Sequence, residues 1–359
     1  MIDDMGGINY RSSGVNIENA NETKEKFKDI VSSKSLSHCR PLNRVGAFAS
    51  LVEIGLQDYK EPVFVLKSEE PGSKQLLSVK QNRIAWIARD LVNHLINDVI
   101  VTGANPCAVL DTIICGKFEK ETVLKLVEEI SGACSENGCV LVGGETSEQP
   151  GVLPDGRYIL QASALGIVEK SKIIDGAAIK RGDALIALAS NGLHSNGYSL
   201  VRKLIDTKPG ILDEKIENEM FLDNILKPHT SYFKAVKAVL EEYLPDIHAL
   251  AHITGGGIYD NLVRVMPAKN LRADIDLSAV KIPAVFGLIK KYADMTDGEM
   301  LNGSPFNNGV GLIAAVGAAK AEKIIEVIKK EGIEAYRIGE IAESAGDGKV
   351  AMHNNLIWP

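Results

Sequence analysis

The sequence predicts two domains of the α+β or α/β type, in which helices cover mixed β-sheets. The chain has 359 residues, and because this is too long for one hydrophobic core, two domains of roughly 170–190 residues are expected. Apolar runs typical of strands alternate along the chain with segments of helical periodicity. We place the domain boundary between residues 174 and 175, where polar and glycine residues precede a fresh strand–turn–helix unit.

The first domain, residues 1–174, begins with a polar lead-in that ends near residue 36 and is expected to be mostly helical or irregular. Beyond it, β-branched and other apolar runs predict strands, and an apolar stripe through Ile84, Leu91 and Leu95 is typical of a helix. Strands are expected at residues 61–67, 107–115, 140–142 and 158–168, and helices at 84–101 and 122–134.

The second domain, residues 175–359, opens with the apolar run 184–188, which predicts a buried strand. A helix follows a polar turn, because Leu200, Leu204 and Ile205 recur at helical spacing. Further strands are expected at residues 248–253, 271–276, 310–316 and toward the end of the chain, and further helices at 232–243, 257–265, 285–292 and 321–330.

Composition and charge exclude several classes of protein. A net charge of −7 without a basic run argues against a general nucleic-acid binder, although phosphorylated small substrates need only local positive potential. No apolar run approaches the roughly 20 residues that span a bilayer, and the first residues do not resemble a signal peptide. Five scattered cysteines form no metal-ligand spacing and indicate buried thiols in a reducing cytoplasm. We therefore expect a cytoplasmic protein without nucleic-acid or membrane partners.

The turn between the strand at 184–188 and the next helix carries the strongest signal for a binding site. It reads Ser-Asn-Gly-Leu-His-Ser-Asn-Gly and contains His194, Ser195 and Asn196. A polar, glycine-rich turn that leads into a helix exposes backbone N–H groups and favours anions. An ordinary loop with a capping serine or asparagine is the alternative.

Two other glycine-rich segments predict binding loops. Gly143 and Gly144 follow a strand and would permit a turn with positive φ and close backbone approach, while Glu145 offers an oxygen to a cation such as Mg²⁺. A tight turn with surface acids is the alternative there. Gly255 and Gly256 belong to a Thr-Gly-Gly-Gly segment before a helix, which favours contact with a phosphate over a flexible connector.

Single residues add weaker signals. Asp98 interrupts an apolar helix, as expected either for a cation ligand or for an exposed helix edge. Lys74 follows Gly-Ser and could contact a phosphate, although any exposed lysine would look the same. His252 lies in a predicted strand, where we favour a structural histidine. The Phe-Asn-Asn-Gly segment that contains Asn307 is equally consistent with a hairpin turn.

These segments together resemble aminoimidazole ribonucleotide synthetase, also called phosphoribosylformylglycinamidine cyclo-ligase. The resemblance covers nearly the whole chain in a consistent order, and it includes Val-Gly-Gly-Glu-Thr, His-Ser-Asn-Gly-Tyr-Ser and Ala-His-Ile-Thr-Gly-Gly-Gly. The matching segments are residues 10–15, 59–63, 97–98, 103–106, 110–111, 116–117, 142–146, 166–170, 189–202, 251–257 and 306–311.

The resemblance implies a fold, a reaction and an assembly. The N-terminal domain would be an α+β domain whose strands pair across a homodimer to form a β-barrel, with a second α+β domain packed beside it. The enzyme would use ATP and Mg²⁺ to close the imidazole ring of formylglycinamidine ribonucleotide in purine biosynthesis, releasing aminoimidazole ribonucleotide, ADP and phosphate. Its catalysis would consist chiefly of positioning and charge stabilisation of phosphoryl transfer.

The resemblance also implies roles for individual residues. His194 would stand near the reacting amide oxygen as hydrogen-bond donor or general acid, with Ser195 and Asn196 shaping the site. The metal ligands carried over in this way are Asp98, Glu145 and Glu69. The residues implied to bind the nucleotide are Lys28, Lys74, Gly143, Gly144, Thr146, Gly255, Gly256 and Asn307.

Three loops depart from the family pattern. Residues 69–74 read Glu-Glu-Pro-Gly-Ser-Lys where the family has Asp-Gly-Val-Gly-Thr-Lys, residues 302–305 replace an Arg-Thr pair, and residues 228–230 read Pro-His-Thr in place of Pro-Thr-Arg. A related ATP-using enzyme with another substrate and a non-catalytic nucleotide-binding paralogue therefore stay open as alternatives. Selenophosphate synthetase is disfavoured because its N-terminal reactive cysteine is missing here. The hydrogenase-maturation relative is disfavoured because the sequence ends in Leu-Ile-Trp-Pro, without a terminal cysteine. Thiamine-monophosphate kinase is disfavoured because its loops lack the His-Ser-Asn-Gly-Tyr-Ser string.

Overall fold

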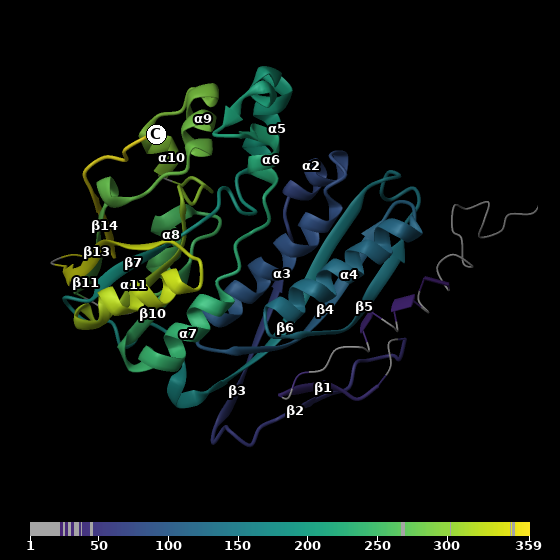
Figure 1. Cartoon of the computed structure of the whole chain (residues 1–359), viewed down its shortest axis with the longest axis horizontal. Coiled ribbons are helices and arrows are strands. Elements are labelled where there is room, and N and C mark those ends of the chain that lie inside the picture. The colour runs from purple at the N-terminus through teal and green to yellow at the C-terminus, as the bar shows by residue number, and fades with distance from the viewer. Residues whose placement is uncertain are drawn as a thin grey trace, which may run out of the picture.

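The structure, a computed structural model, describes most of the chain from residue 46 onward. The described residues are 22, 23, 26, 27, 30, 31, 36, 38–43, 46–266, 270–301, 303–344, 346 and 349–359. Lys28 and the segment 10–15 lie outside the described residues. Two larger sheets with helices packed against them form the bulk of the described protein (Figure 1).

The N-terminal sheet has four strands in the order β3-β6-β4-β5. Its strands are β3 (Pro62–Glu69), β4 (Asn105–Cys115), β5 (Val140–Glu148) and β6 (Tyr158–Glu169). Strands β4 and β5 run parallel and are joined by α4 (Lys120–Glu136), whereas the other pairs are antiparallel. Helices α4 and α3 (Ile84–Ile100) cover one face of this sheet (Figure 1).

The other face of the N-terminal sheet is covered only in part, by apolar side chains of residues 39–54 that pack against Ala108, Val142 and Ile167. Side chains alternate between the two faces along each strand. In β3 the even-numbered residues point to this second face, where Phe64 and Leu66 are exposed. Leu110 of β4 and Ile159 of β6 are exposed as well. The described strands form an open sheet of four within one chain, with no closed barrel among them.

The C-terminal sheet has six strands and is covered on both faces. Its order is β10-β12-β7-β13-β11-β14, with only β11 and β14 parallel. The strands are β7 (Ala184–Ala189), β10 (Ile247–His252), β11 (Leu271–Asp276), β12 (Val310–Val316), β13 (Ala335–Glu343) and β14 (Val350–His353). The predicted buried strand is confirmed in β7, where Ile186 and Leu188 pack into one apolar cluster and Leu185 and Ala187 into another.

Helices on the two faces of the C-terminal sheet account for these two clusters. Helices α7 (Phe233–Tyr243) and α11 (Ala321–Lys330) cover one face, and α8 (Gly257–Arg264) covers the other. A third apolar cluster joins the helices α5 (Tyr198–Thr207), α6 (Phe221–Leu226), α9 (Ala284–Ala293) and α10 (Asp297–Leu301). The other α-helix and the other strands of the described ranges are α2 (Lys74–Lys80), β1 (Cys39–Pro41), β2 (Val52–Ile54), β8 (Lys215–Ile216) and β9 (Glu219–Met220).

The two sheets lie on either side of the predicted boundary at residues 174 and 175, but the apolar core is not divided there. The largest cluster of buried side chains runs from α3 and α4 through to α7, α11 and β7. The division into residues 1–174 and 175–359 therefore stays a prediction, while α+β content with helices over mixed sheets is what the structure shows.

The predicted glycine turn after residue 142 is wrong. Strand β5 continues through Gly143 and Gly144, and neither glycine has a positive φ. A Cβ at Gly144 would lie 1.8 Å from Oδ1 of Asp111, and one at Gly143 would lie 2.4 Å from Oγ of Ser50. The two glycines are required because neighbouring side chains cross the strand there, not because the chain turns.

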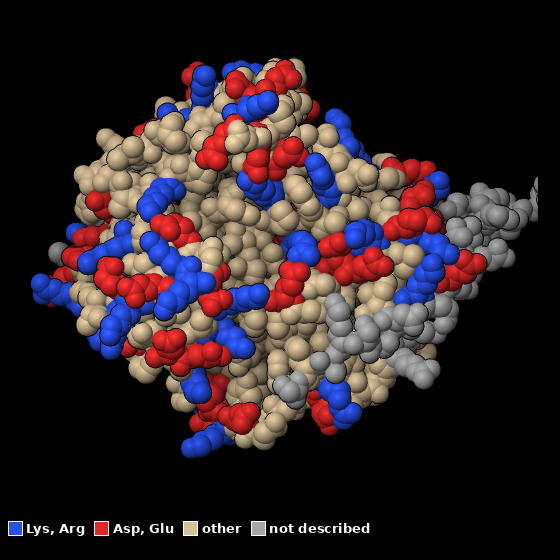
Figure 2. Space-filling view, viewed as in Figure 1, with Lys and Arg blue, Asp and Glu red and all other residues tan. Residues whose placement is uncertain are grey.

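The five cysteines are free and buried, as the sequence predicts. None of the helices in the described ranges has the length and apolar character needed to cross a membrane. Acidic and basic side chains are interspersed over the face shown in Figure 2.

Candidate active site

Helix α3 carries a stripe of polar side chains through an otherwise apolar helix. Residues three or four positions apart share one face of a helix, and the members of the stripe are Asp90, Asn93, His94, Asn97 and Asp98. The stripe faces the segment between α6 and α7. The backbone N–H of His229 donates to Oδ1 of Asp90 at 2.8 Å, and the amides of Asn93 and Asn97 donate to the carbonyls of His229 and Thr230 at 2.7 and 2.8 Å.

Lys74 belongs to the support of this segment and not to an open binding surface. Its side chain and that of Asp90 are both 0% exposed and form an ion pair of 2.8 Å. The Lys74 ammonium also donates to the carbonyl of Lys227 at 2.6 Å. A fully buried ammonium that is neutralised in this way is not available to a phosphate, so the structure replaces the predicted phosphate contact with a structural role.

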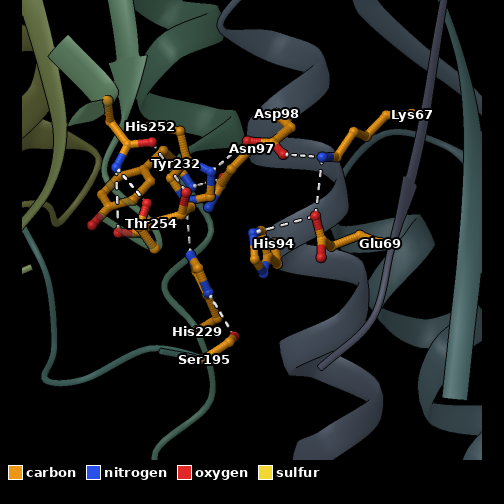
Figure 3. A network of polar contacts seen from close by, with 12 residues as sticks. Lys67, Glu69, His94, Asn97, Asp98, Ser195, His229, Tyr232, His252 and Thr254 are labelled. Atoms are coloured by element: carbon orange, nitrogen blue, oxygen red, sulfur yellow. Dashed lines mark hydrogen bonds and ion pairs between the residues drawn. The ribbon is translucent and has the colours of Figure 1, made fainter. Parts of the chain in front are cut away.

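Four side chains form a continuous chain of hydrogen bonds at the junction of the two sheets (Figure 3). Oγ of Ser195 lies 3.1 Å from Nδ1 of His229, and Nε2 of His229 lies 2.9 Å from Nε2 of His252. Nδ1 of His252 lies 2.8 Å from Oδ1 of Asp98. His252 was expected to be a structural histidine, and at the end of β10 it is buried with both ring nitrogens paired within this network.

Lys67 connects the same network to the end of β3. Its ammonium lies 2.9 Å from Oδ2 of Asp98 and 3.0 Å from Oε2 of Glu69, between two of the predicted metal ligands (Figure 3). Nε2 of His94 lies 3.6 Å from the same oxygen of Glu69. The structure therefore brings Asp98 and Glu69 together, with a lysine between them.

His194 is buried beside His229. The two rings stack with centroids 3.8 Å apart, and Nε2 of His194 lies 3.2 Å from Oγ1 of Thr230. Nδ1 of His194 is buried without a hydrogen-bond partner, and the residue has a φ of 60°. Positive φ at a non-glycine residue is strained and is found preferentially at functional sites.

Burial keeps the imidazoles of His94, His194 and His229 neutral. It lowers the pKa of His94 to about 4, with a further contribution from His252, and it lowers the pKa values of His194 and His229 well below the ordinary range. Burial opposes ionisation of Asp98, but the hydrogen bond and charge of His252, helped by His94 and Lys67, hold the pKa of Asp98 below its usual value. A neutral His194 can donate a hydrogen bond but carries no proton to give as a strong general acid.

The glycine loop after β10 lies against the His194 turn. Gly256 has a φ of 95° and precedes α8, and a Cβ at Gly255 would lie 3.4 Å from Oδ1 of Asn196. On the other side, a Cβ at Gly72 would lie 3.3 Å from the carbonyl oxygen of Ser195. Three loops that are distant in the sequence therefore meet around residues 194–196.

Asn307 is committed to holding the His194 turn. Its side chain is 2% exposed. Oδ1 accepts from Oγ of Ser190 at 3.0 Å and from the backbone of Gly309 at 2.8 Å, and Nδ2 donates to the carbonyl of Gly192 at 3.0 Å. These bonds give Asn307 a structural role in place of the predicted contact with the nucleotide.

Glu145 lies apart from the other predicted metal ligands. Glu69, Ala162, Asp111 and Gly144 form one row across the sheet, on the face that α3 covers. Glu145 is the next residue and therefore points to the partly covered face. Strands lie about 4.8 Å apart, so three strand steps place β5 roughly 14 Å from β3. The prediction that Glu145 joins Asp98 and Glu69 around one cation is corrected on this geometry.

The sequence reasoning missed several members of the site. His94, Lys67 and His229 were not singled out as functional residues, and Asp111 appeared only within a matching segment. His94 precedes Asp98 by one helical turn, and His229 lies in a loop that departs from the family pattern, so both carried a signal. Asp111 is buried beneath Gly144, and burial raises the pKa of its carboxyl to about 7.

Comparisons with known proteins agree with this architecture. Residues 65–168 match the N-terminal domain of the AIR synthase related proteins, and residues 180–350 match their C-terminal domain. A phosphoribosylformylglycinamidine cyclo-ligase of Thermoanaerobacter sp. (strain X514) is 39% identical over 342 residues, which are 94% of this chain and 99% of the relative.

Solved structures of hydrogenase maturation proteins share the fold. E. coli HypE is similar with a TM-score of 0.65 and 17% identity, over 95% of this chain and 97% of the other. A HypE in complex with ATP has a TM-score of 0.64 and 17% identity, over 97% of this chain and 92% of the other. At this level of identity the likeness concerns the fold alone.

Proposed function

Because the chain belongs to the phosphoribosylformylglycinamidine cyclo-ligase family, we propose that it closes the imidazole ring of formylglycinamidine ribonucleotide with ATP. The products are aminoimidazole ribonucleotide, ADP and phosphate, which makes the protein a C–N bond-forming ligase of purine biosynthesis. One observation of this structure supports the proposal. The loops around Gly72, His194 and Gly255 and the carboxylates of Asp98 and Glu69 converge on one junction between the sheets.

The chemistry requires an activated oxygen and a positioned nucleophile. The formyl oxygen is a poor leaving group, so the γ-phosphoryl group of ATP is transferred to it and ADP leaves. The amidine nitrogen then attacks the activated carbon, the C–O bond breaks and phosphate departs. Positioning and charge stabilisation supply most of the catalysis of such a transfer.

His194 is proposed to act as a hydrogen-bond donor near the reacting amide oxygen. Its imidazole is neutral because burial lowers its pKa, and a neutral ring carries one N–H group. Ser195 and Asn196 shape the same turn, and Asn196 lies against Gly255. The backbone of Gly255 and Gly256, at the start of α8, is proposed to contact the phosphates of ATP.

Thr146 is a further proposed nucleotide contact. It lies in β5 and pairs with Ile113, on the face of the sheet that α3 and α4 cover. A structural neighbour solved with ATP supports nucleotide binding by this fold.

Asp98 and Glu69 are the residues proposed to hold Mg²⁺. Carboxylate oxygens suit this ion, and both side chains lie within 3.0 Å of one ammonium group, so they already surround a cation position. Binding of the metal there requires that Lys67 move aside. The ion would supply charge neutralisation for the phosphates of the nucleotide.

A second copy of the chain is proposed to complete the cover of the partly covered face of the N-terminal sheet. Phe64 is 54% exposed, Leu66 79% and Leu110 45% on that face. Exposed apolar side chains gathered on one sheet face favour association, and the family pattern of a dimer with a shared barrel uses this domain. Free, buried thiols fit a cytoplasmic location.

The test is ADP release by the full chain with formylglycinamidine ribonucleotide and Mg²⁺. Turnover should depend on that substrate, and His194→Ala should lower kcat by about 10²–10³-fold, the range for loss of one hydrogen-bond donor at a developing charge. His353→Gln, at an exposed histidine far from the junction in sequence, serves as control. Absence of substrate-dependent ADP release from the folded wild-type chain would contradict the proposal.

A further inference from the structure

The ammonium of Lys67 lies between the two carboxylates that are proposed to hold Mg²⁺ (Figure 3). It is 2.9 Å from Oδ2 of Asp98 and 3.0 Å from Oε2 of Glu69. Lys67 and Glu69 are two residues apart in β3, so both side chains point to the face of the sheet that meets α3, the helix that carries Asp98. A lysine side chain therefore occupies the cation position, and the proposed cyclo-ligase chemistry gives this lysine no role.

The two carboxylates are oriented by other groups as well as by the lysine. Oδ1 of Asp98 lies 2.8 Å from Nδ1 of His252, and Oε1 of Glu69 accepts from the backbone N–H of Glu70 at 3.1 Å. Each carboxylate therefore has one oxygen held by a neighbouring group and the other oxygen directed at the ammonium. Both of these inner oxygens stay directed at the same position when the ammonium is withdrawn.

Lys67 is far less confined than another lysine beside α3. Lys74 is 0% exposed, and its ammonium bonds to Asp90 and to the carbonyl of Lys227. The side chain of Lys67 is 34% exposed, and its ammonium ends a flexible stem of four carbons. Partly exposed ion pairs contribute little to stability, so little free energy holds this ammonium between the two carboxylates.

The charge of Lys67 opposes the binding of a free divalent cation at this position. One ammonium neutralises half of the charge of the two carboxylates. Like charges repel more strongly in partly buried surroundings than in water, because the effective dielectric constant is lower there. A metal ion that arrives alone must therefore displace a positive charge that stays tethered nearby through the backbone of β3.

We infer that Lys67 holds the cation position until the nucleotide binds, and that it thereby makes the binding of Mg²⁺ and of the nucleotide cooperative. Without the nucleotide, the ammonium pairs with Asp98 and Glu69. With the nucleotide, it pairs with a phosphate oxygen and leaves both carboxylates to the metal. The part played by the nucleotide rests on the proposed function, whereas the competition between Lys67 and Mg²⁺ does not.

The nucleotide supplies a partner for the ammonium and further ligands for the metal. Mg²⁺ is usually bound by one or two carboxylates together with waters and phosphate oxygens, so Asp98 and Glu69 provide only part of its coordination. The backbone proposed to contact the phosphates begins at Gly255, three residues after His252, which bonds to Asp98. Three residues span at most about 10 Å, so the phosphate-binding backbone lies close to the cation position.

The experiment measures two affinities of the full chain by calorimetry: that of Mg²⁺ alone, and that of a hydrolysis-resistant ATP analogue with and without excess Mg²⁺. Lys67→Met should bind Mg²⁺ alone at least about 10-fold more tightly than the wild type, because no tethered charge competes. The gain in analogue affinity on adding Mg²⁺ should be about 10-fold larger in the wild type than in Lys67→Met. Lys67→Arg, which keeps the charge, and Lys281→Met, which removes an exposed lysine elsewhere, should resemble the wild type.

Equal affinity of Mg²⁺ alone for the folded wild type and for folded Lys67→Met, including binding to neither, would overturn the inference. An equal gain from Mg²⁺ in the two proteins would overturn it as well. Neither result would affect the proposed reaction, which is tested by ADP release with formylglycinamidine ribonucleotide. Conversely, an inactive wild type that shows both differences from Lys67→Met would contradict the proposed reaction and support the role of Lys67.

Discussion

Two lysine–carboxylate groups lie along helix α3 and differ mainly in burial. Lys74 and Asp90 pair at 2.8 Å with both side chains 0% exposed. Eight residues further along the helix, Asp98 lies 2.9 Å from the ammonium of Lys67 in β3, which also lies 3.0 Å from Glu69. The side chains of Lys67, Asp98 and Glu69 are 34%, 23% and 20% exposed. The contact distances are alike, but the surroundings are not.

The ionisation of the two groups is shifted in opposite directions. Burial lowers the pKa of Lys74 and raises that of Asp90 to about 6, because removal from water outweighs the attraction within the pair. Around Lys67 burial also disfavours the charge, but the bonds to Asp98 and Glu69 outweigh it and raise the pKa of Lys67. The first group therefore acts as a fixed support for His229, and the second, which is partly exposed, is the one proposed to bind the metal.

Lys74→Met should give the largest effect. The substitution leaves the carboxylate of Asp90 buried without its partner, and breaking a buried pair from one side costs about 3–5 kcal/mol. Chemical denaturation of the variant and the wild type measures this loss. The double variant Lys74→Met/Asp90→Leu should recover part of it, since no charge is then left behind; an equal or greater loss in the double variant would contradict the assignment.

The pH dependence of stability should have opposite signs for Asp90 and Asp98. The pKa of Asp90 is about 6 in the folded chain, above its ordinary value, so the folded state binds more protons between about pH 4 and 6. The unfolding free energy of the wild type relative to Asp90→Asn should therefore rise as the pH falls through that window, by about 1–3 kcal/mol.

For Asp98 the folded-state pKa lies below the ordinary value, so the unfolded state binds more protons in acid. The unfolding free energy of the wild type relative to Asp98→Asn should be fully present above about pH 4 and should fall below it. Denaturant titrations from pH 3 to 7 measure both differences. If both free-energy differences changed with pH in the same direction, the opposite pKa shifts assigned to Asp90 and Asp98 would be wrong.

Gly144→Ala extends the comparison to Asp111, a buried carboxyl group without a lysine. The new methyl group would lie 1.8 Å from Oδ1 of Asp111, so the two strands must shift, at a loss of about 1–3 kcal/mol in stability. Gly132→Ala is the matched control, because a Cβ at this position in α4 meets no atom within 4 Å. The control should stabilise the helix by up to about 1 kcal/mol. Equal melting temperatures of the two variants would count against the close contact between Gly144 and the side chain of Asp111.

Lys67→Met should have the smallest effect on stability. Partly exposed ion pairs contribute about 0–1 kcal/mol, and Asp98 keeps its hydrogen bond to His252 in the variant. The loss should be comparable to that of Lys281→Met, which removes an exposed pair with Glu334. Thermal denaturation measures both, and a loss as large as that of Lys74→Met would erase the distinction between the two groups.

Local periodicity was enough to locate most helices and strands. The strands at 271–276 and 310–316 and the helix at 321–330 begin and end at the expected residues. Their limits could be predicted because the spacing of apolar residues is a property of neighbouring positions in the sequence. The prediction of a turn at Gly143 was wrong because two adjacent glycines are typical of a turn when only the local sequence is considered. In the structure the pairing of β4 with β5 places the side chain of Asp111 against Gly144, so a residue without a side chain is needed there.

The candidate site likewise has features that the sequence predicted and features that only the structure revealed. The sequence by itself determined the family, the chemistry of the His194 turn and the acidic character of Asp98 and Glu69, because these reside in contiguous motifs. Only the tertiary structure decided that Lys74 is a buried support, that Glu145 faces the partly covered side of the sheet, and that His229 meets His252. Burial and the pairing of distant segments set charge, access and ligand geometry, and neither quantity is encoded at any single position of the chain.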